Sequence, residues 1–319
     1  MARRRANQFT KTAGIVFSGL VALSMILSLL GPLLFRAPQP ATPTPVPTWT
    51  PWPTYTPTPE PEATEMLPPP TAAPPPPATP TPDAEDAPIA GPGGSFRFAV
   101  IGDTRKNDEV HRKLLSMIVE DGNEFLINTG DLVEYGSKKN FEAFRELMSD
   151  FPLPFYPVPG NHDRDDDGTL INYIEYSGAP GSHYSFDADL VHFTMASSST
   201  GSLTEQELQW IADDLDSTDL PVKVVVLHYP PFDPDGTSYT LFSGGEAFME
   251  LMEAYGVAYV FAGHIHAYST EERNGTTYVI TGGGGAPLDE EEHPQALYHY
   301  VQVTVDGTEI TTELRPLQE

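Results

Sequence analysis

The stretch Ala99-Val100-Ile101-Gly102-Asp103-Thr104-Arg105 has the pattern that decides the fold. An apolar run typical of a buried strand is followed at once by a glycine and a polar side chain. Similar junctions recur further along the chain, at Gly130-Asp131, Gly160-Asn161-His162-Asp163, His228 and Gly263-His264-Ile265-His266. Because open α/β sheets bind ligands at the carboxyl ends of their strands, we expect these five segments to meet in one site.

The side chains of these segments are carboxylates, an amide and imidazoles, and the chain contains no cysteine. The absence of cysteine excludes disulfides, thiolate zinc sites and a cysteine nucleophile. Oxygen and imidazole ligands suit hard or borderline metal ions. His264 and His266 are two residues apart, so both rings point to the same side of an extended segment. The sequence therefore predicts a hydrolytic site with two metal ions.

From about residue 94 to residue 319, strand patterns alternate with helical patterns and then give way to β-hairpins. This order predicts one α/β domain of mixed β-sheets flanked by helices. We expect strands at 95–101, 124–129, 155–158, 184–197 (two strands around a turn), 222–227, 257–262, 276–281, 297–305 and 309–314, and helices at 108–121, 138–150, 204–215 and 245–255.

The N-terminal third has a different composition. Residues 13–35 carry no charge and are long enough to span a bilayer as a helix, and they follow a basic segment that contains Arg3, Arg4, Arg5 and Lys11. We therefore expect a cytoplasmic tail at 1–12 and a transmembrane signal-anchor at 13–35. Residues 36–93 are rich in proline and threonine and predict a disordered stalk. The alternative to the anchor is a cleaved signal peptide, which the length of the apolar run disfavours.

The formal net charge of the chain is −28. An acidic domain repels polyanions, so we expect no nucleic acid as a partner. A small anion can still reach a metal site, because bound cations reverse the local field.

Residues 95–314 resemble the calcineurin-like metallophosphoesterase superfamily through the five segments. Further motifs resemble its purple-acid-phosphatase-like branch, namely Tyr184-Ser185-Phe186-Asp187, Glu205-Gln206 with Gln209-Trp210, and His228-Tyr229-Pro230-Pro231. The resemblance implies a four-layer α/β-β/α sandwich of mixed β-sheets. It also implies two divalent or trivalent metal ions (Mn, Fe or Zn) and attack on phosphorus by a metal-activated hydroxide.

The resemblance also assigns roles to individual residues. Asp131 would bridge both metals, Asp103 and His266 would bind the first, and Asn161, His228 and His264 would bind the second. His162 would face the phosphate as general acid or transition-state stabiliser, and Asp163 would orient the His162 ring.

Arg105 departs from the family pattern, which usually has a histidine ligand of the first metal at this position. An arginine is always protonated and cannot bind a cation. Purple acid phosphatases supply a tyrosine three residues after the bridging Asp, where this chain has Glu134 followed by Tyr135. Glu134, Tyr135, His111 or water could fill the gap, although we expect His111 to face solvent from its helix. We expect Arg105 to clamp substrate phosphate, and the alternative is an ordinary salt bridge.

Other polar residues remain without an assigned role. The run from Asp163 to Gly168 resembles a calcium loop but has Ile174 where such a loop needs glutamate, so we expect a solvated acidic loop. His183, His192, His293 and His299 could each line a substrate pocket, and spacing alone assigns none of them.

The function that these features predict is a single-pass, membrane-anchored, extracytoplasmic phosphoesterase. Its substrates would be phosphorylated small molecules or surface material, with phosphomonoesters favoured over phosphodiesters. One alternative is a non-catalytic module that binds phosphorylated ligands with an incomplete first metal site. Another is a structural stalk protein whose globular part is only a headgroup.

Overall fold

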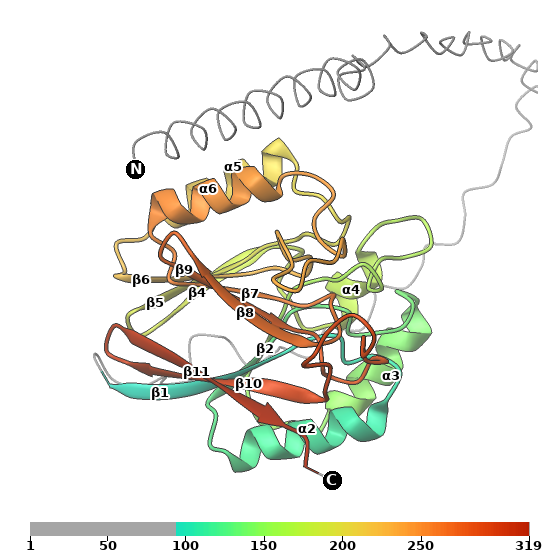
Figure 1. Cartoon of the computed structure of the whole chain (residues 1–319). Coiled ribbons are helices and arrows are strands. Elements are labelled where there is room, and N and C mark those ends of the chain that lie inside the picture. Colours follow the sequence, from blue (N-terminus) through green and yellow to red (C-terminus); the bar gives the residue numbers. More distant parts are fainter. Residues whose placement is uncertain (1–93, 319) are drawn as a thin grey trace, which may run out of the picture. The chain divides into compact units, whose positions relative to one another are not determined.

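The computed structural model describes residues 94–318, which form two β-sheets packed face to face (Figure 1). The first sheet has the strand order β11-β10-β1-β2-β3, and the second has the order β4-β5-β6-β7-β9-β8. The first sheet consists of β1 (Ser95–Ile101), β2 (Phe125–Asn128), β3 (Phe155–Pro157), β10 (His299–Asp306) and β11 (Glu309–Pro316). The second consists of β4 (Tyr184–Ala188), β5 (Val191–Met195), β6 (Val222–Val226), β7 (Tyr259–Ala262), β8 (Tyr268–Arg273) and β9 (Thr276–Thr281).

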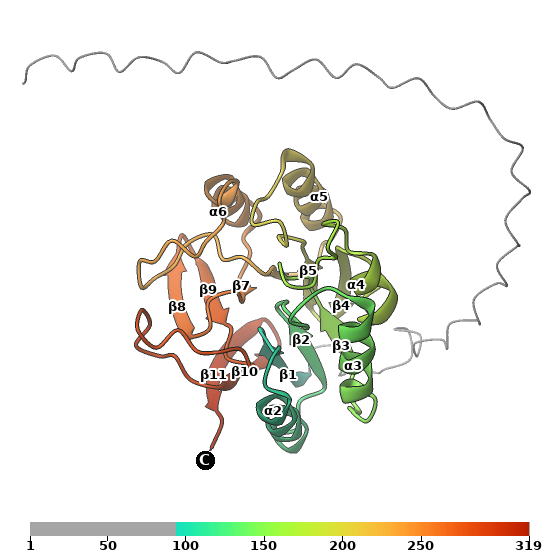
Figure 2. The same cartoon turned by 90° about the vertical axis from the view of Figure 1, so that its right-hand side faces the viewer.

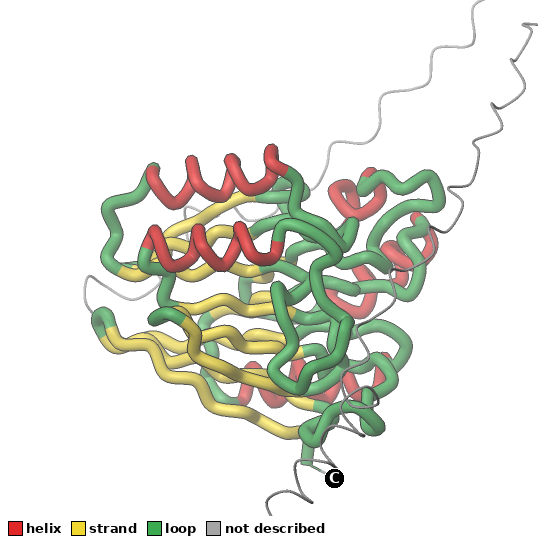
Figure 3. The backbone as a smooth tube through the Cα atoms, turned by 45° about the horizontal axis from the view of Figure 1, so that its top comes forward, coloured by secondary structure: helices red, strands yellow, loops and turns green. Residues whose placement is uncertain are grey.

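Both sheets are mixed, as the sequence predicts. Strands β1, β2 and β3 run parallel, and β10 and β11 are added to them as an antiparallel hairpin. In the second sheet β5, β6, β7 and β9 run parallel, with β4 and β8 antiparallel at the two edges. The carboxyl ends of the parallel strands carry the long loops, which gather at one end of the sheets (Figure 3).

Side-chain alternation along the strands separates the buried layers. Phe96, Phe98 and Val100 of β1 belong to the core between the two sheets, together with residues of β5, β6 and β7. Ala99 and Ile101 point to the other face of the first sheet, where they pack against α2 (Asp108–Glu120). Alternate residues of one strand therefore stabilise two different interfaces.

Helices cover both outer faces, which gives four layers (Figures 1 and 2). Helices α5 (Glu205–Asp216) and α6 (Gly245–Tyr255) pack on the second sheet. Helices α2 and α3 (Lys138–Met148) flank the first sheet, and the short α4 (Ile171–Tyr176) packs against α3. Three of these helices, α2, α3 and α5, are capped by a side chain that accepts a backbone N–H of the first turn. The capping residues are Asn107, Ser137 and Thr204.

Two described elements were not predicted from sequence. The strand β8 is an edge strand whose residues 271–273 are all charged, a common way to protect an edge from aggregation, so its pattern is not that of a buried strand. The helix α4 has six residues and no side-chain cap. The remaining predicted strands and helices are present, with ends shifted by one or two residues in most cases.

The tail, anchor and stalk predicted for residues 1–12, 13–35 and 36–93 lie outside the described residues. Among residues 94–318, no helix combines the length and the apolar character needed to cross a bilayer.

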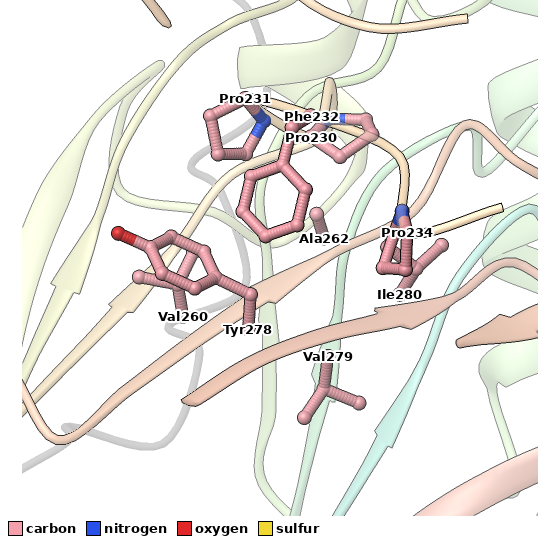
Figure 4. A pocket seen from close by; sticks show the side chains of 9 residues that line it. All are labelled: Pro230, Pro231, Phe232, Pro234, Val260, Ala262, Tyr278, Val279 and Ile280. Atoms are coloured by element: carbon pink, nitrogen blue, oxygen red, sulfur yellow. The ribbon is translucent and has the colours of Figure 1, made fainter. Parts of the chain in front are cut away.

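The segment after β6 is held against the second sheet by apolar contacts. Phe232 lies beside Tyr278 of β9, and Pro230 lines the same depression, which is too narrow to admit a water molecule (Figure 4). The rings of Phe232 and Tyr278 meet edge to face with their centroids 5.1 Å apart. These contacts fix the loop that begins at His228, just after the strand.

Candidate metal centre

The five segments meet where the parallel strands of the two sheets end. Asp103 follows β1, Asp131 follows β2 and Asn161 follows β3, whereas His228 follows β6 and His264 follows β7. Three of these residues have positive φ, with values of 56° for Asp103, 58° for Asp131 and 68° for His264. Residues other than glycine rarely adopt this backbone conformation, and such strain is concentrated at functional sites. The turn after each strand thus directs its side chain into a shared space.

Three candidate ligand atoms converge on the predicted second metal position. His228 Nε2 lies 3.0 Å from Asn161 Oδ1 and 3.4 Å from Asp131 Oδ1. The other ring nitrogen, Nδ1, lies 2.9 Å from the Thr129 carbonyl oxygen and therefore carries a proton. Nε2 is thus the ring atom that faces the two oxygens, and an imidazole nitrogen with a carboxylate and an amide oxygen is a donor set that a metal ion can use. These residues fit a metal ion at the second position.

His264 extends this group from the second sheet. Its ring packs on Tyr229, with centroids 3.8 Å apart, and lies 5.2 Å from the His228 ring. Burial and the neighbouring His228 lower the pKa of His264 to about 3. The imidazole is therefore neutral at physiological pH, as a metal ligand must be.

The two carboxylate oxygens of Asp131 contact different groups. Its Oδ1 accepts the backbone N–H of His162 at 2.9 Å and faces His228, and its Oδ2 pairs with Arg105 Nε at 3.2 Å. Burial opposes ionisation, but His228, His162 and Arg105 together keep the pKa of Asp131 below its ordinary value. Gly160 is required beside it, because a Cβ there would lie 2.1 Å from Asp131 Oδ1.

The prediction that Asp163 orients the His162 ring is wrong. The buried Asp163 carboxylate accepts four backbone N–H groups, from Asp131, Leu132, Val133 and Gly160, at 2.8–3.2 Å. Burial and the nearby Asp131 raise the pKa of Asp163 to about 7, against these four donors, which favour the carboxylate. Asp163 therefore ties the loop after β2 to the loop after β3 and positions Asp131.

The His162 ring is oriented by a main-chain group instead. His162 Nδ1 donates to the Glu134 carbonyl oxygen at 2.7 Å, and Nε2 lies 3.9 Å from Asp131 Oδ2. The side chain is 29% exposed, unlike the buried His228. His162 thus presents Nε2 at the open side of the centre, where a substrate can reach it.

Arg105 lies inside the centre and not at the surface. Its guanidinium contacts Asp131 Oδ2 at 3.2 Å, Glu134 Oε2 at 2.7 Å and His266 Nε2 at 3.4 Å, and the side chain is 8% exposed. Burial lowers its pKa, but the negative charges of Asp131, Asp103 and Glu134 more than offset this and raise the pKa of Arg105. The guanidinium is therefore a permanent charge among residues predicted to bind the first metal.

His266 and Asp103 complete this side of the centre. His266 Nδ1 lies 2.6 Å from the Pro287 carbonyl oxygen, and the His266 backbone N–H donates to Asp289 Oδ2 at 2.8 Å. Asp103 Oδ2 accepts the His264 backbone N–H at 2.8 Å, and the buried Oδ1, which accepts no hydrogen bond, lies 3.4 Å from His266 Nε2. Asp289 was not predicted from sequence, because nothing distinguishes it from the acidic run 289–292 that it begins.

His111 is buried, so the prediction that it faces solvent is wrong. It is 2% exposed, its ring stacks on Phe144, and Nε2 has no hydrogen-bond partner. Burial lowers the pKa of His111 to about 3. A cavity of about 170 Å³ lies beside it, and Arg105 and Glu134 also line this cavity.

The remaining polar groups have structural partners outside the centre. In the acidic loop, Asp165 accepts the backbone N–H groups of Ile171 and Asn172 at the start of α4, which fits a loop rather than a calcium site. The four unassigned histidines contact groups away from the predicted ligands. His183 stacks on Trp210, His192 lies between Asp187 and Asp214, His293 contacts Asp235, and His299 donates to the Leu297 carbonyl.

Two layered sheets with acidic and imidazole side chains at their shared strand ends define a metallohydrolase type of centre. The chain belongs to the calcineurin-like phosphoesterase family, whose model matches residues 96–268, more than half of the sequence. It is 31% identical over 157 residues to purple acid phosphatase 23 of Arabidopsis thaliana, covering 42% of this chain and 34% of that protein. It is 28% identical over 182 residues to the probable glycerophosphodiester phosphodiesterase GpdQ of Arcobacter nitrofigilis, covering 51% of this chain and 65% of that protein.

The chain thus spans between about a third and two thirds of these two relatives. Among solved structures, its fold is similar to the purple acid phosphatase PPD1 of yellow lupin, with a TM-score of 0.60 and 18% identity, over 71% of this chain and 52% of that one. The predicted resemblance to the superfamily and to its purple-acid-phosphatase-like branch is confirmed.

Proposed function

We propose that this chain is a metal-dependent phosphoesterase that hydrolyses phosphomonoesters or phosphodiesters. The observation that carries the proposal is the convergence of three candidate ligand atoms, His228 Nε2, Asn161 Oδ1 and Asp131 Oδ1, beside the partly exposed ring of His162. The relatives with phosphatase and phosphodiesterase names support this class of substrate.

Residues Asp131, Asn161, His228 and His264 would hold the metal ion at the second position. When bound, such an ion polarises a phosphoryl oxygen and activates water as a nucleophile. The chain supplies the geometry: Asp163 fixes the backbone of Asp131, and Thr129 fixes the tautomer of His228. These contacts lie in the interior, so the ligands are held in place before substrate arrives.

His162 would supply the proton to the leaving group. Its Nδ1 proton is committed to the Glu134 carbonyl oxygen, so only Nε2 can reach a substrate. Donation from Nε2 requires the doubly protonated ring, and Asp131 Oδ2 lies 3.9 Å from Nε2. Arg105 remains the proposed contact for phosphate oxygens, because a guanidinium has five N–H donors and three face protein groups.

The test is turnover of the full-length chain, purified in mild detergent and freed of metal. A generic phosphomonoester and a phosphodiester are assayed with manganese, iron or zinc added. We expect metal-dependent turnover that is lost in Asp131→Ala and His162→Ala and kept in His183→Ala, which removes an imidazole away from the centre. Phosphate binding without turnover under every metal would favour the non-catalytic alternative.

We also propose that the phosphoesterase domain is anchored outside the cytoplasm. The uncharged run 13–35 after the basic residues Arg3, Arg4, Arg5 and Lys11 supports an anchor with the C-terminus outside, and the Pro/Thr-rich residues 36–93 support a stalk. Protease added to intact cells should release the domain by cutting the stalk. Protection of the domain would refute this orientation, and a mature chain that begins after residue 35 would indicate a cleaved signal peptide.

A further inference from the structure

The residues at the first metal position already surround a cation. Asp103, Asp131 and His266 are the ligands that the family pattern predicts there. The guanidinium of Arg105 lies 3.2 Å from Asp131 Oδ2 and 3.4 Å from His266 Nε2. Two of the three predicted ligands therefore contact Arg105.

His266 Nε2 lies between a cation and an anion, 3.4 Å from both Arg105 Nη2 and Asp103 Oδ1. His266 Nδ1 faces the Pro287 carbonyl oxygen at 2.6 Å, and a carbonyl oxygen can only accept. Nδ1 therefore carries a proton, and Nε2 is the ring atom directed at the first metal position. The guanidinium of Arg105 already lies beside this atom.

The two carboxylate oxygens of Asp131 face two different cation positions. Oδ1 faces His228 at the second position, and Oδ2 pairs with Arg105. In the family pattern this carboxylate would bridge two metals. Here the same bridging geometry joins one metal position to a guanidinium.

The substitutes considered for the missing ligand do not restore the site. Glu134 is held by Arg105 at 2.7 Å and by Lys106 at 3.0 Å. Tyr135 is 66% exposed, and His111 is buried against Phe144. Of the three predicted ligands, Asp103 is the one not paired with Arg105, and its Oδ1 accepts no hydrogen bond and lies 3.4 Å from His266 Nε2. One such oxygen is too few for a zinc or manganese ion, which needs four or more ligands. The residues present do not fit a metal at the first position.

We propose that this protein has a single-metal centre in which the guanidinium of Arg105 permanently replaces the first metal ion. The inference rests on the proposed function for its second metal position. Arg105 stays charged at any physiological pH and offers two further N–H donors to phosphoryl oxygens. It neutralises charge on the substrate, but it supplies no ligand position for water.

The test counts metal ions in the full-length protein after loading with Mn²⁺. Metal content is measured by mass spectrometry, and electron paramagnetic resonance reports whether two Mn²⁺ ions are exchange-coupled. We expect one uncoupled ion at the centre of the wild-type protein. Arg105→His, which restores the usual imidazole, should gain a second ion and a coupled signal.

Two controls make the count specific. Lys106→Gln removes a neighbouring positive charge without touching the ligand atoms and should keep one ion. Asp233, Asp235 and His293 form another group of ligand atoms within 4.8 Å of one another, so the count is repeated in His293→Ala. An ion bound there would be lost in that variant without altering any coupled signal.

Two coupled ions in the wild-type protein, or none, would overturn the proposal. So would a single ion in folded Arg105→His, because the guanidinium would then not be what excludes the second. If Arg105→His does not fold, Arg105→Ala replaces it and should gain an ion at higher Mn²⁺ concentration. The count is independent of turnover, so an inactive protein with one ion would refute the proposed function and leave this inference standing.

Discussion

Replacing Asp163 by asparagine should destabilise the domain itself and not only its activity. Asp163 Oδ1 accepts the N–H groups of Leu132 and Val133, and Oδ2 accepts those of Asp131 and Gly160. In Asp163→Asn one oxygen becomes an NH₂ group, which cannot accept, so two buried donors lose their partner. Each such donor costs about 1–3 kcal/mol, which gives about 2–6 kcal/mol in total.

The assay is thermal unfolding by differential scanning calorimetry. In a domain of this size, 1 kcal/mol shifts Tm by roughly 2–4 °C, so we expect a fall on the order of 10 °C. The scan is run with a chelator present, so that it reports folding and not metal affinity. Asp166→Asn makes the same chemical change on the exposed side of the same loop and should leave Tm unchanged.

The opposite pattern would refute this reasoning. If Asp163→Asn keeps the wild-type Tm but shifts the pH profile of kcat, the carboxylate acts on the His162 ring, as the sequence predicts. A drop in Tm with the kcat profile unmoved supports the backbone contacts instead.

Three further outcomes follow from the same geometry. First, Gly160→Ala should abolish metal binding, because its Cβ would lie 2.1 Å from Asp131 Oδ1; metal content after gel filtration checks this, with Gly181→Ala as the control that should bind normally. Second, chelation should lower the wild-type Tm and added metal should restore it, since a ligand present at 100 times its Kd stabilises by about 2.7 kcal/mol; an unchanged Tm would mean that the folded protein binds no metal. Third, burial lowers the pKa of His111 to about 3, so as pH falls His111 is protonated in the unfolded chain before it is protonated in the folded one. The folded state therefore loses stability as pH falls from about 6.5 toward 3. At pH 5 this costs about 2 kcal/mol, so His111→Leu should gain Tm relative to wild type at pH 5 but not at pH 7.5.

The parallel strands and their ligand-bearing ends were predictable because one local pattern encodes both. An apolar run such as Ala99-Val100-Ile101 identifies a buried strand, and the glycine after it allows the chain to turn. Strand β1 begins and ends where the pattern predicts. The packing of two sheets then brings His228 and Asp131 together. No single segment encodes this contact, and it was expected only from the shared position of these residues at strand ends and from the family resemblance.

The burial of His111 could have been predicted from its spacing along the helix. His111 precedes Leu114, Leu115 and Ile118 by three, four and seven residues, which is the spacing of one helix face. Its position therefore indicates the buried face of α2, although the residue type suggests solvent. Asp163 offered no comparable signal, because a carboxylate next to a histidine in sequence can contact either the ring or the neighbouring backbone.

Arg105 shows why a missing metal ligand in a sequence allows two interpretations of the site. An arginine at the place of a histidine ligand is equally compatible with a degraded site and with a replaced cation, since sequence does not show where the guanidinium lies. The structure places it among Asp103, Asp131 and Glu134, with Lys106 also paired to Glu134. The guanidinium thus lies between carboxylates at the position where the family pattern expects a cation. This placement favours a replaced cation over a degraded site.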